Sequence, residues 1–166
     1  MELRIAGTAN DSIVDGPGIR FTIFTQGCPH HCEGCHNPQT HDFSGGTITD
    51  TDELLNRIKS NPLLDGVTFS GGEPFCQAAA LAELGSKIKA LGLNIVTYTG
   101  YTFEELYADR HKNGFGELLS VTDYLIDGPF VLAQKNWEIR FRGSSNQRII
   151  DVAASLRTGT AVTIEL

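Results

Sequence analysis

The chain has 166 residues, of which 40% are hydrophobic and 20% are charged, a composition typical of a globular domain. Its formal net charge of -7 argues against nucleic acid as a partner, because phosphate binding needs clustered basic side chains. No apolar run is long enough to cross a bilayer, and the first residues lack a signal-peptide pattern. We therefore expect a single domain spanning residues 1–166, in the cytoplasm, with no membrane partner.

Strand and helix patterns alternate along the chain. Residues 19–25 alternate apolar and polar side chains and are rich in β-branched and aromatic types, which predicts a strand. Residues 49–52 offer helix-capping side chains for a helix that ends near Lys59. Similar patterns predict helices over 76–91 and 103–110, and strands over 66–69, 93–98, 124–127, 147–152 and 160–164.

This alternation implies βαβ crossovers and a parallel sheet. A closed eight-stranded (β/α) barrel takes about 250 residues, so this chain can build only part of one. We predict an α/β fold, an open partial (β/α) barrel, in preference to a flavodoxin-like doubly wound sheet. In either fold the ligand-binding loops lie at the carboxyl ends of the strands.

Three cysteines lie in one loop directly after the 19–25 strand: Cys28, Cys32 and Cys35. Thiolates at this spacing can hold three irons of a [4Fe–4S] cluster and leave the fourth iron open to an exchangeable ligand. The alternative is structural zinc, whose fourth ligand would be one of His30, His31, His36, His41 or Cys76. Zinc is commonly held by paired Cys-x-x-Cys units, and a second such unit is absent. Cys76 starts a predicted amphipathic helix, so we expect it to be a buried apolar residue.

The segment Ser70-Gly71-Gly72-Glu73-Pro74 follows the next predicted strand and should lie on the same edge of the sheet as the cysteines. Alone, the glycine pair is explained by an ordinary strand-to-helix turn. Beside an open iron it favours a cradle that receives a small charged ligand through the backbone, since glycine has no side chain to block the approach.

Together the two motifs resemble the radical S-adenosylmethionine (SAM) superfamily. Within it, Val14–Arg20, Gln26–Pro29 and Cys35–Pro38 resemble the glycyl-radical-enzyme activases, and Arg142–Ile150 resembles the activating proteins of anaerobic (class III) ribonucleotide reductase. The resemblance covers essentially the whole chain. It implies a [4Fe–4S] cluster on the three cysteines and SAM at the open iron.

The resemblance also implies an activity. Reductive cleavage of SAM to methionine and a 5′-deoxyadenosyl radical would create a glycyl radical on the large catalytic subunit of anaerobic ribonucleotide reductase. Since the chain has no further group of cysteines for a second cluster, the electron would come from a one-electron donor such as flavodoxin or ferredoxin. The alternatives are an activase of another glycyl radical enzyme, such as pyruvate formate-lyase, and a radical SAM enzyme acting on a small molecule.

Further contacts to SAM are implied for a few residues. Gly34 stands where the superfamily often has an aromatic residue, so any adenine contact there comes from the backbone. Glu73 either accepts a hydrogen bond from the SAM ammonium group or braces its own turn. Asp127 is a candidate anchor for SAM or for a bound cation, with a turn residue as the alternative. Asn146 and Gln147 could reach the ribose of SAM.

Overall fold

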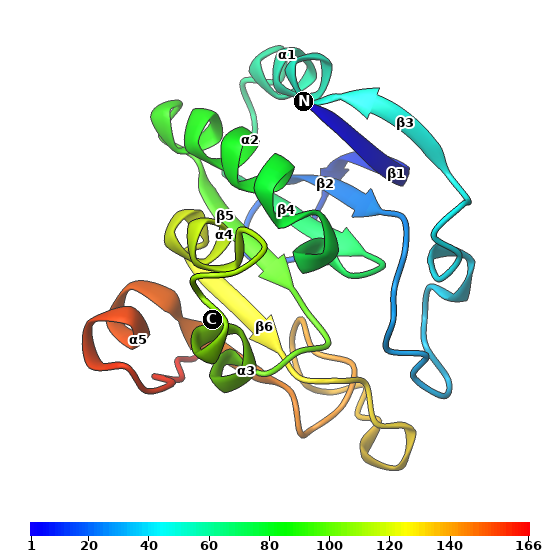
Figure 1. The fold of residues 1–166 in the computed structure, drawn as a ribbon, viewed down its shortest axis with the longest axis vertical. Coiled ribbons are helices and arrows are strands. Elements are labelled where there is room, and N and C mark those ends of the chain that lie inside the picture. The colour runs from blue at the N-terminus through cyan, green and yellow to red at the C-terminus, as the bar shows by residue number, and fades with distance from the viewer.

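A computed structural model describes residues 1–166 and contains one seven-stranded sheet in the order β3-β1-β2-β4-β5-β6-β7 (Figure 1). β2, β4, β5 and β6 are parallel, whereas β1, β3 and β7 join the sheet antiparallel to their neighbours. The sheet does not close, because β3 and β7 remain at its two edges. The strands span Glu2–Ser12 (β1), Arg20–Thr25 (β2), Thr47–Asp50 (β3), Gly66–Gly71 (β4), Asn94–Tyr98 (β5), Tyr124–Asp127 (β6) and Arg148–Asp151 (β7).

Five α-helices connect or follow these strands: α1 (Thr51–Lys59), α2 (Ala78–Ala90), α3 (Phe103–Ala108), α4 (Phe115–Val121) and α5 (Val152–Thr158). Short 3-10 turns occur at Pro38–Thr40 (η1), Pro74–Gln77 (η2) and Leu132–Gln134 (η3). Local chemistry sets several helix starts: Asp50 accepts from the second residue of α1, and Thr102 forms a capping box with Glu105 at α3. No helix is both long enough and apolar enough to span a membrane.

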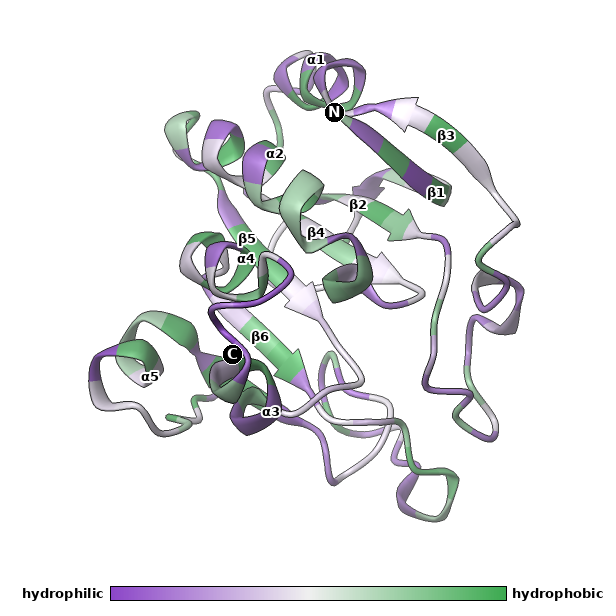
Figure 2. Cartoon of the chain, in the orientation of Figure 1, coloured by the Kyte–Doolittle hydropathy of each residue, from purple (hydrophilic) through white to green (hydrophobic).

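All five helices contribute buried side chains to one core cluster, which also holds alternate residues of the strands. Along β4, for example, Val67 and Phe69 enter this core, while Thr68 and Ser70 lie on the opposite face. Figure 2 shows hydrophobic residues along β2 and β6, and both hydrophobic and hydrophilic residues on α1. Helices packed into one core fit a partial (β/α) barrel, because a doubly wound sheet would carry helices on both faces.

The prediction of an open α/β sheet is thus confirmed, and the strand over 124–127 has the expected bounds. The predicted strand over 160–164 is wrong: it contributes only a single bridge between Ile150 and Thr163. The preceding segment instead forms α5, because Asp151 ends β7 and caps the helix by accepting from Ala154 N.

Candidate active site

The loops that follow the parallel strands line one cavity of about 810 Å³, a size common for small-molecule sites. The cysteine loop follows β2, the Gly71-Gly72 turn follows β4, and Gly100 and Gly128 follow β5 and β6. The structure therefore brings both sequence motifs to the carboxyl edge of the sheet. Cys28, Cys32, Cys35, Gly71 and Gly72 all line this cavity.

The cysteine loop is tied to the sheet at its base. Gly27 N donates to Thr40 O at 2.7 Å, and Cys28 N donates to His41 O at 3.2 Å. Burial raises the pKa of the Cys28 thiol. All three cysteines are free thiols and share one cavity, but the structure does not gather any three Cys, His, Asp or Glu groups into a formed metal site.

Two further observations fit an iron–sulfur cluster and a ligand in this cavity. Asn37 N donates to Cys35 Sγ at 3.4 Å, the kind of backbone contact that tunes a cluster's potential. Two of the three buried side-chain polar atoms without a partner, His41 Nε2 and Arg142 Nε, belong to residues of the cavity wall. Buried polar atoms are normally satisfied, so these two indicate a site that a bound group completes.

The Gly71-Gly72 turn packs tightly against the protein's own backbone. Gly71 has a φ of +96°, and a Cβ there would lie 2.4 Å from Thr25 N. A Cβ on Gly72 would lie 2.4 Å from the Gly27 carbonyl oxygen. Gly72 N donates to Thr25 O, and Glu73 N donates to Gly27 O, both at 2.8 Å. Glycine is thus required here to join the turn to the start of the cysteine loop, whatever the cavity holds.

Glu73 braces this turn. Its side chain has no exposed surface, and its carboxylate is engaged from three loops. His30 Nε2 lies 2.6 Å from Oε1, Gly100 N donates to the same oxygen at 2.8 Å, and Phe75 N donates to Oε2 at 3.0 Å. The Thr99 hydroxyl lies within 3.0 Å of both oxygens. Of the two roles considered for Glu73, these contacts are those of a brace.

Asp127 is also buried, and its carboxylate is fully engaged in hydrogen bonds within the protein. Arg148 donates to both of its oxygens, and Phe103 N at the start of α3 donates to Oδ2 at 2.8 Å. Arg148 bridges to Glu104 as well, and its hydrogen bonds to Asp127 raise its pKa. The carboxylate therefore joins β6, β7 and α3, and it is neither a bare turn residue nor free to anchor a ligand.

Asn146 and Gly34 do not line the cavity, although the next residue in the chain does so in each case: Gln147 after Asn146 and Cys35 after Gly34. Asn146 Nδ2 donates to Pro129 O at 2.8 Å, and its Oδ1 accepts from the Ser144 hydroxyl at 2.6 Å, so it fastens the loop after β6. Gly34 adopts a φ of +75°, and a Cβ there would lie 2.9 Å from Leu132 Cδ1. Of the two residues considered for the ribose, Gln147 lines the cavity and Asn146 does not.

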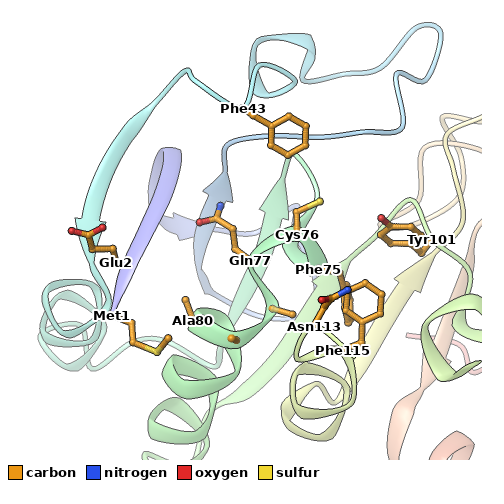
Figure 3. A pocket seen from close by; sticks show the side chains of 12 residues that line it. Met1, Glu2, Phe43, Phe75, Cys76, Gln77, Ala80, Tyr101, Asn113 and Phe115 are labelled. Atoms are coloured by element: carbon orange, nitrogen blue, oxygen red, sulfur yellow. The ribbon is translucent and has the colours of Figure 1, made fainter. Parts of the chain in front are cut away.

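The expectation that Cys76 is buried is wrong. Cys76 is exposed and lines a second hollow of about 700 Å³, where Figure 3 shows its side chain among those of the other lining residues. Desolvation by this largely apolar lining, with a smaller effect from the Glu73 charge, raises the pKa of Cys76 to about 11. Cys76 is not among the residues that line the cysteine cavity, and so is no ligand in it.

Several residues that line the cavity had no individual role in the sequence analysis. Asp15, Ser70 and Tyr98 all line it, and burial raises the pKa of the Tyr98 hydroxyl, which keeps it a hydrogen-bond donor. Period-2 alternation along the strands was the available signal, because Ser70 and Tyr98 point away from the helices. Arg20 is fully buried below them, and burial lowers its pKa to about 10.

Comparison with known proteins agrees with this geometry. The family model described as a 4Fe-4S single cluster domain matches residues 14–150, so the chain belongs to that family. An anaerobic ribonucleoside-triphosphate reductase-activating protein of Vibrio cholerae is 34% identical over 82% of this chain and 90% of its own length. A pyruvate formate-lyase-activating enzyme of Staphylococcus aureus is 38% identical over 86% of this chain and 59% of its own length.

Among solved structures, QueE from Escherichia coli aligns with a TM-score of 0.49 and 19% identity, over 61% of this chain and 54% of QueE. A likeness this slight adds nothing to the family assignment, which rests on the family model and the sequence relatives.

Proposed function

We propose that this chain activates anaerobic ribonucleoside-triphosphate reductase by generating a glycyl radical on it. The observation that carries the proposal is the match to activating proteins of that reductase from several bacteria, at 32–34% identity and across 90% of their length. The cavity at the carboxyl edge of the sheet supports it, because both motifs of the radical SAM resemblance line that cavity.

In this proposal Cys28, Cys32 and Cys35 hold the [4Fe–4S] cluster. When bound, the cluster and SAM supply an electron and a source of a carbon-centred radical, which is chemistry that protein side chains do not provide. The backbone of the Gly71-Gly72 turn receives the amino group of SAM. The role of Glu73 is to hold that turn at a fixed place relative to the cysteine loop.

The chain's other contribution is to keep competing groups away from the site. Below the cavity, Arg20 is held inside the sheet by Thr68 and by the carbonyl oxygens of Pro17 and Val67, at 2.7–2.8 Å. Arg20 is fully buried and does not line the cavity, so its guanidinium does not compete for a bound ligand. Only Cys76 remains beside the three cluster cysteines, which is too few to bind a second cluster, so the proposal requires an external one-electron donor such as flavodoxin or ferredoxin.

A second candidate, activation of pyruvate formate-lyase, is favoured by the higher identity of 38% to the enzyme from Staphylococcus aureus. That match leaves about two fifths of the relative without a counterpart in this chain, whereas the reductase-activating proteins are matched almost throughout. We therefore rank it second.

One experiment separates the two candidates. The anaerobically purified, reduced protein is incubated with SAM and, in parallel, with each of the two large enzymes, and radical formation is followed by electron paramagnetic resonance. We expect a stable glycyl radical on the reductase and at most a trace on pyruvate formate-lyase. The reverse pattern would establish the second candidate, and a radical on neither would refute both.

A further inference from the structure

The three most exposed large apolar side chains of the whole molecule line the same cavity. Trp137 is 81% exposed, Ile13 is 72% exposed and Val14 is 71% exposed. The next in rank, Leu63 at 67%, lines neither of the two cavities described above. Scattered exposed apolar residues need no explanation, but a concentration of the largest ones around one opening marks an interaction surface.

These side chains come from two segments that are far apart in sequence. Ile13 and Val14 belong to the connection between β1 and β2, and Trp137 belongs to the connection between η3 and β7. Their presence on one cavity wall is therefore a property of the fold. We call Ile13, Val14 and Trp137 the apolar rim.

Trp137, the chain's one tryptophan, is held in place although it is exposed. Its ring lies nearly parallel to that of His36, with centroids 6.2 Å apart and an interplanar angle of 14°. The Lys135 ammonium lies 4.1 Å from the centroid of the Trp137 ring. His36 directly follows Cys35, so the rim reaches the cysteine loop. A pre-positioned tryptophan at an opening is a common anchor in protein interfaces, because little conformational entropy is lost when it is covered.

The charge at the opening differs from that of the rest of the chain. Among the cavity-lining residues the carboxylate of Asp15 is outnumbered by Arg140 and Arg142, whereas the chain as a whole carries a formal charge of -7. Arg142 Nε is buried without a partner. The opening is therefore suited to a segment that carries carboxylate or carbonyl oxygens, and a second copy of this acidic chain would be repelled elsewhere on its surface.

We propose that the apolar rim docks a surface loop of the protein that this chain activates, a loop with apolar side chains beside its reactive glycine and acceptor oxygens facing Arg142. A small ligand inside the cavity would leave side chains that are more than 70% exposed in contact with water. Only a macromolecule laid across the opening covers them. The rim thereby deepens the proposed function, on which it rests, by naming the surface that recognises the partner.

Covering the rim also completes the cavity. The loop would close the one side that this chain leaves open, so that water is excluded only in the complex. Recognition of the partner and protection of the reactive species would then be the same event.

The test uses the cluster-loaded protein, SAM and the large subunit of the anaerobic reductase. The rim variants are Trp137→Ala and Ile13→Asp, Trp137→Phe is the conservative variant, and Leu63→Asp is the control at an equally exposed apolar site away from the cavity. Visible absorbance establishes that each variant retains its cluster. The initial rate of glycyl-radical formation is measured against the concentration of the large subunit and, separately, against that of SAM.

We expect Trp137→Ala and Ile13→Asp to raise the KM for the large subunit by roughly 10- to 30-fold, with a much smaller change in the KM for SAM. Trp137→Phe should restore most of the loss, and Leu63→Asp should behave as the wild type. If both rim variants keep the wild-type KM for the large subunit, or if Leu63→Asp raises it as much, the rim is not the docking surface. If the wild type itself places no radical on the reductase, the proposed function fails, and the rim proposal falls with it.

Discussion

Replacement of Glu73 tests the central structural claim, that this carboxylate binds three loops together. Glu73→Leu removes the partner of His30 and strips the buried amides of Phe75 and Gly100 of their acceptor. The Thr99 hydroxyl loses the same acceptor, and each buried donor left without a partner costs about 1–3 kcal/mol. Because these contributions overlap, we expect Glu73→Leu to lower the free energy of unfolding by roughly 3–5 kcal/mol.

Glu73→Gln keeps the shape and one acceptor oxygen, so its expected loss is smaller, about 1–3 kcal/mol. The control is Glu83→Gln, since Glu83 is a surface residue whose only ion pair is with Lys87 on the same helix, and such pairs contribute less than about 1 kcal/mol. Urea unfolding of the anaerobic protein, followed by circular dichroism and by cluster absorbance, gives the midpoints. A Glu73→Leu variant that unfolds within 1 kcal/mol of the wild type, as an approximate limit set by surface pairs, would falsify the brace.

Three more predictions follow from the same geometry. Alanine at Cys28, Cys32 or Cys35 should abolish the bound iron, whereas Cys76→Ala should retain it, as iron content and visible absorbance will show; retention by any of the first three would overturn the ligand set. Gly72→Ala should destabilise the protein by roughly 1–3 kcal/mol in urea and reduce cluster content, because its Cβ meets the backbone of the cysteine loop and not only a ligand; wild-type stability would contradict this. The pKa of Cys76 is about 11, so in the cluster-loaded protein this thiol should react with iodoacetamide about a hundredfold more slowly at pH 8 than an ordinary thiol. The rate should rise about tenfold per pH unit up to that pKa. A plateau of the rate near pH 9 would show that the thiol has an ordinary pKa.

The sequence was sufficient to predict the parts of the fold that local chemistry determines. β2 alternates apolar and polar residues, β6 is a short apolar run that ends at Asp127, and α1 starts at a capping aspartate. The existence and approximate bounds of these elements therefore follow from short-range patterns. β1 and β3 lack such a pattern over much of their length and exist because they pair with each other at the sheet edge. α5 (Val152–Thr158) was not predicted for the same reason, since this helix packs Val152 into the shared core.

The placement of the two motifs on one edge was predictable because parallel strands present their carboxyl ends together. The partners of individual side chains were not. Asp127 meets Arg148 because β7 runs antiparallel to β6 in a register that pairs these residues, and neither the direction nor the register of β7 is visible in its own sequence. Cys76 is exposed because a 3-10 turn precedes α2, which rotates it away from the core that a continuous helix from residue 76 would have given it.

Glu73 and Asp127, two carboxylates at the carboxyl edge of the sheet, hold loops together. Both acidic residues that seemed suited to SAM, Glu73 and Asp127, are used to hold loops: one ties the cysteine loop to the glycine turn, and the other joins β6, β7 and α3. Glu73 Oε1 lies 2.6 Å from His30 Nε2, and Asp127 is paired with Arg148. A ligand in the cavity would therefore be received mainly by backbone groups of the glycine turn and by neutral side chains such as Ser70 and Tyr98. Because buried carboxylates hold these loops, the backbone of the glycine turn keeps its place and no carboxylate is needed to bind the ligand.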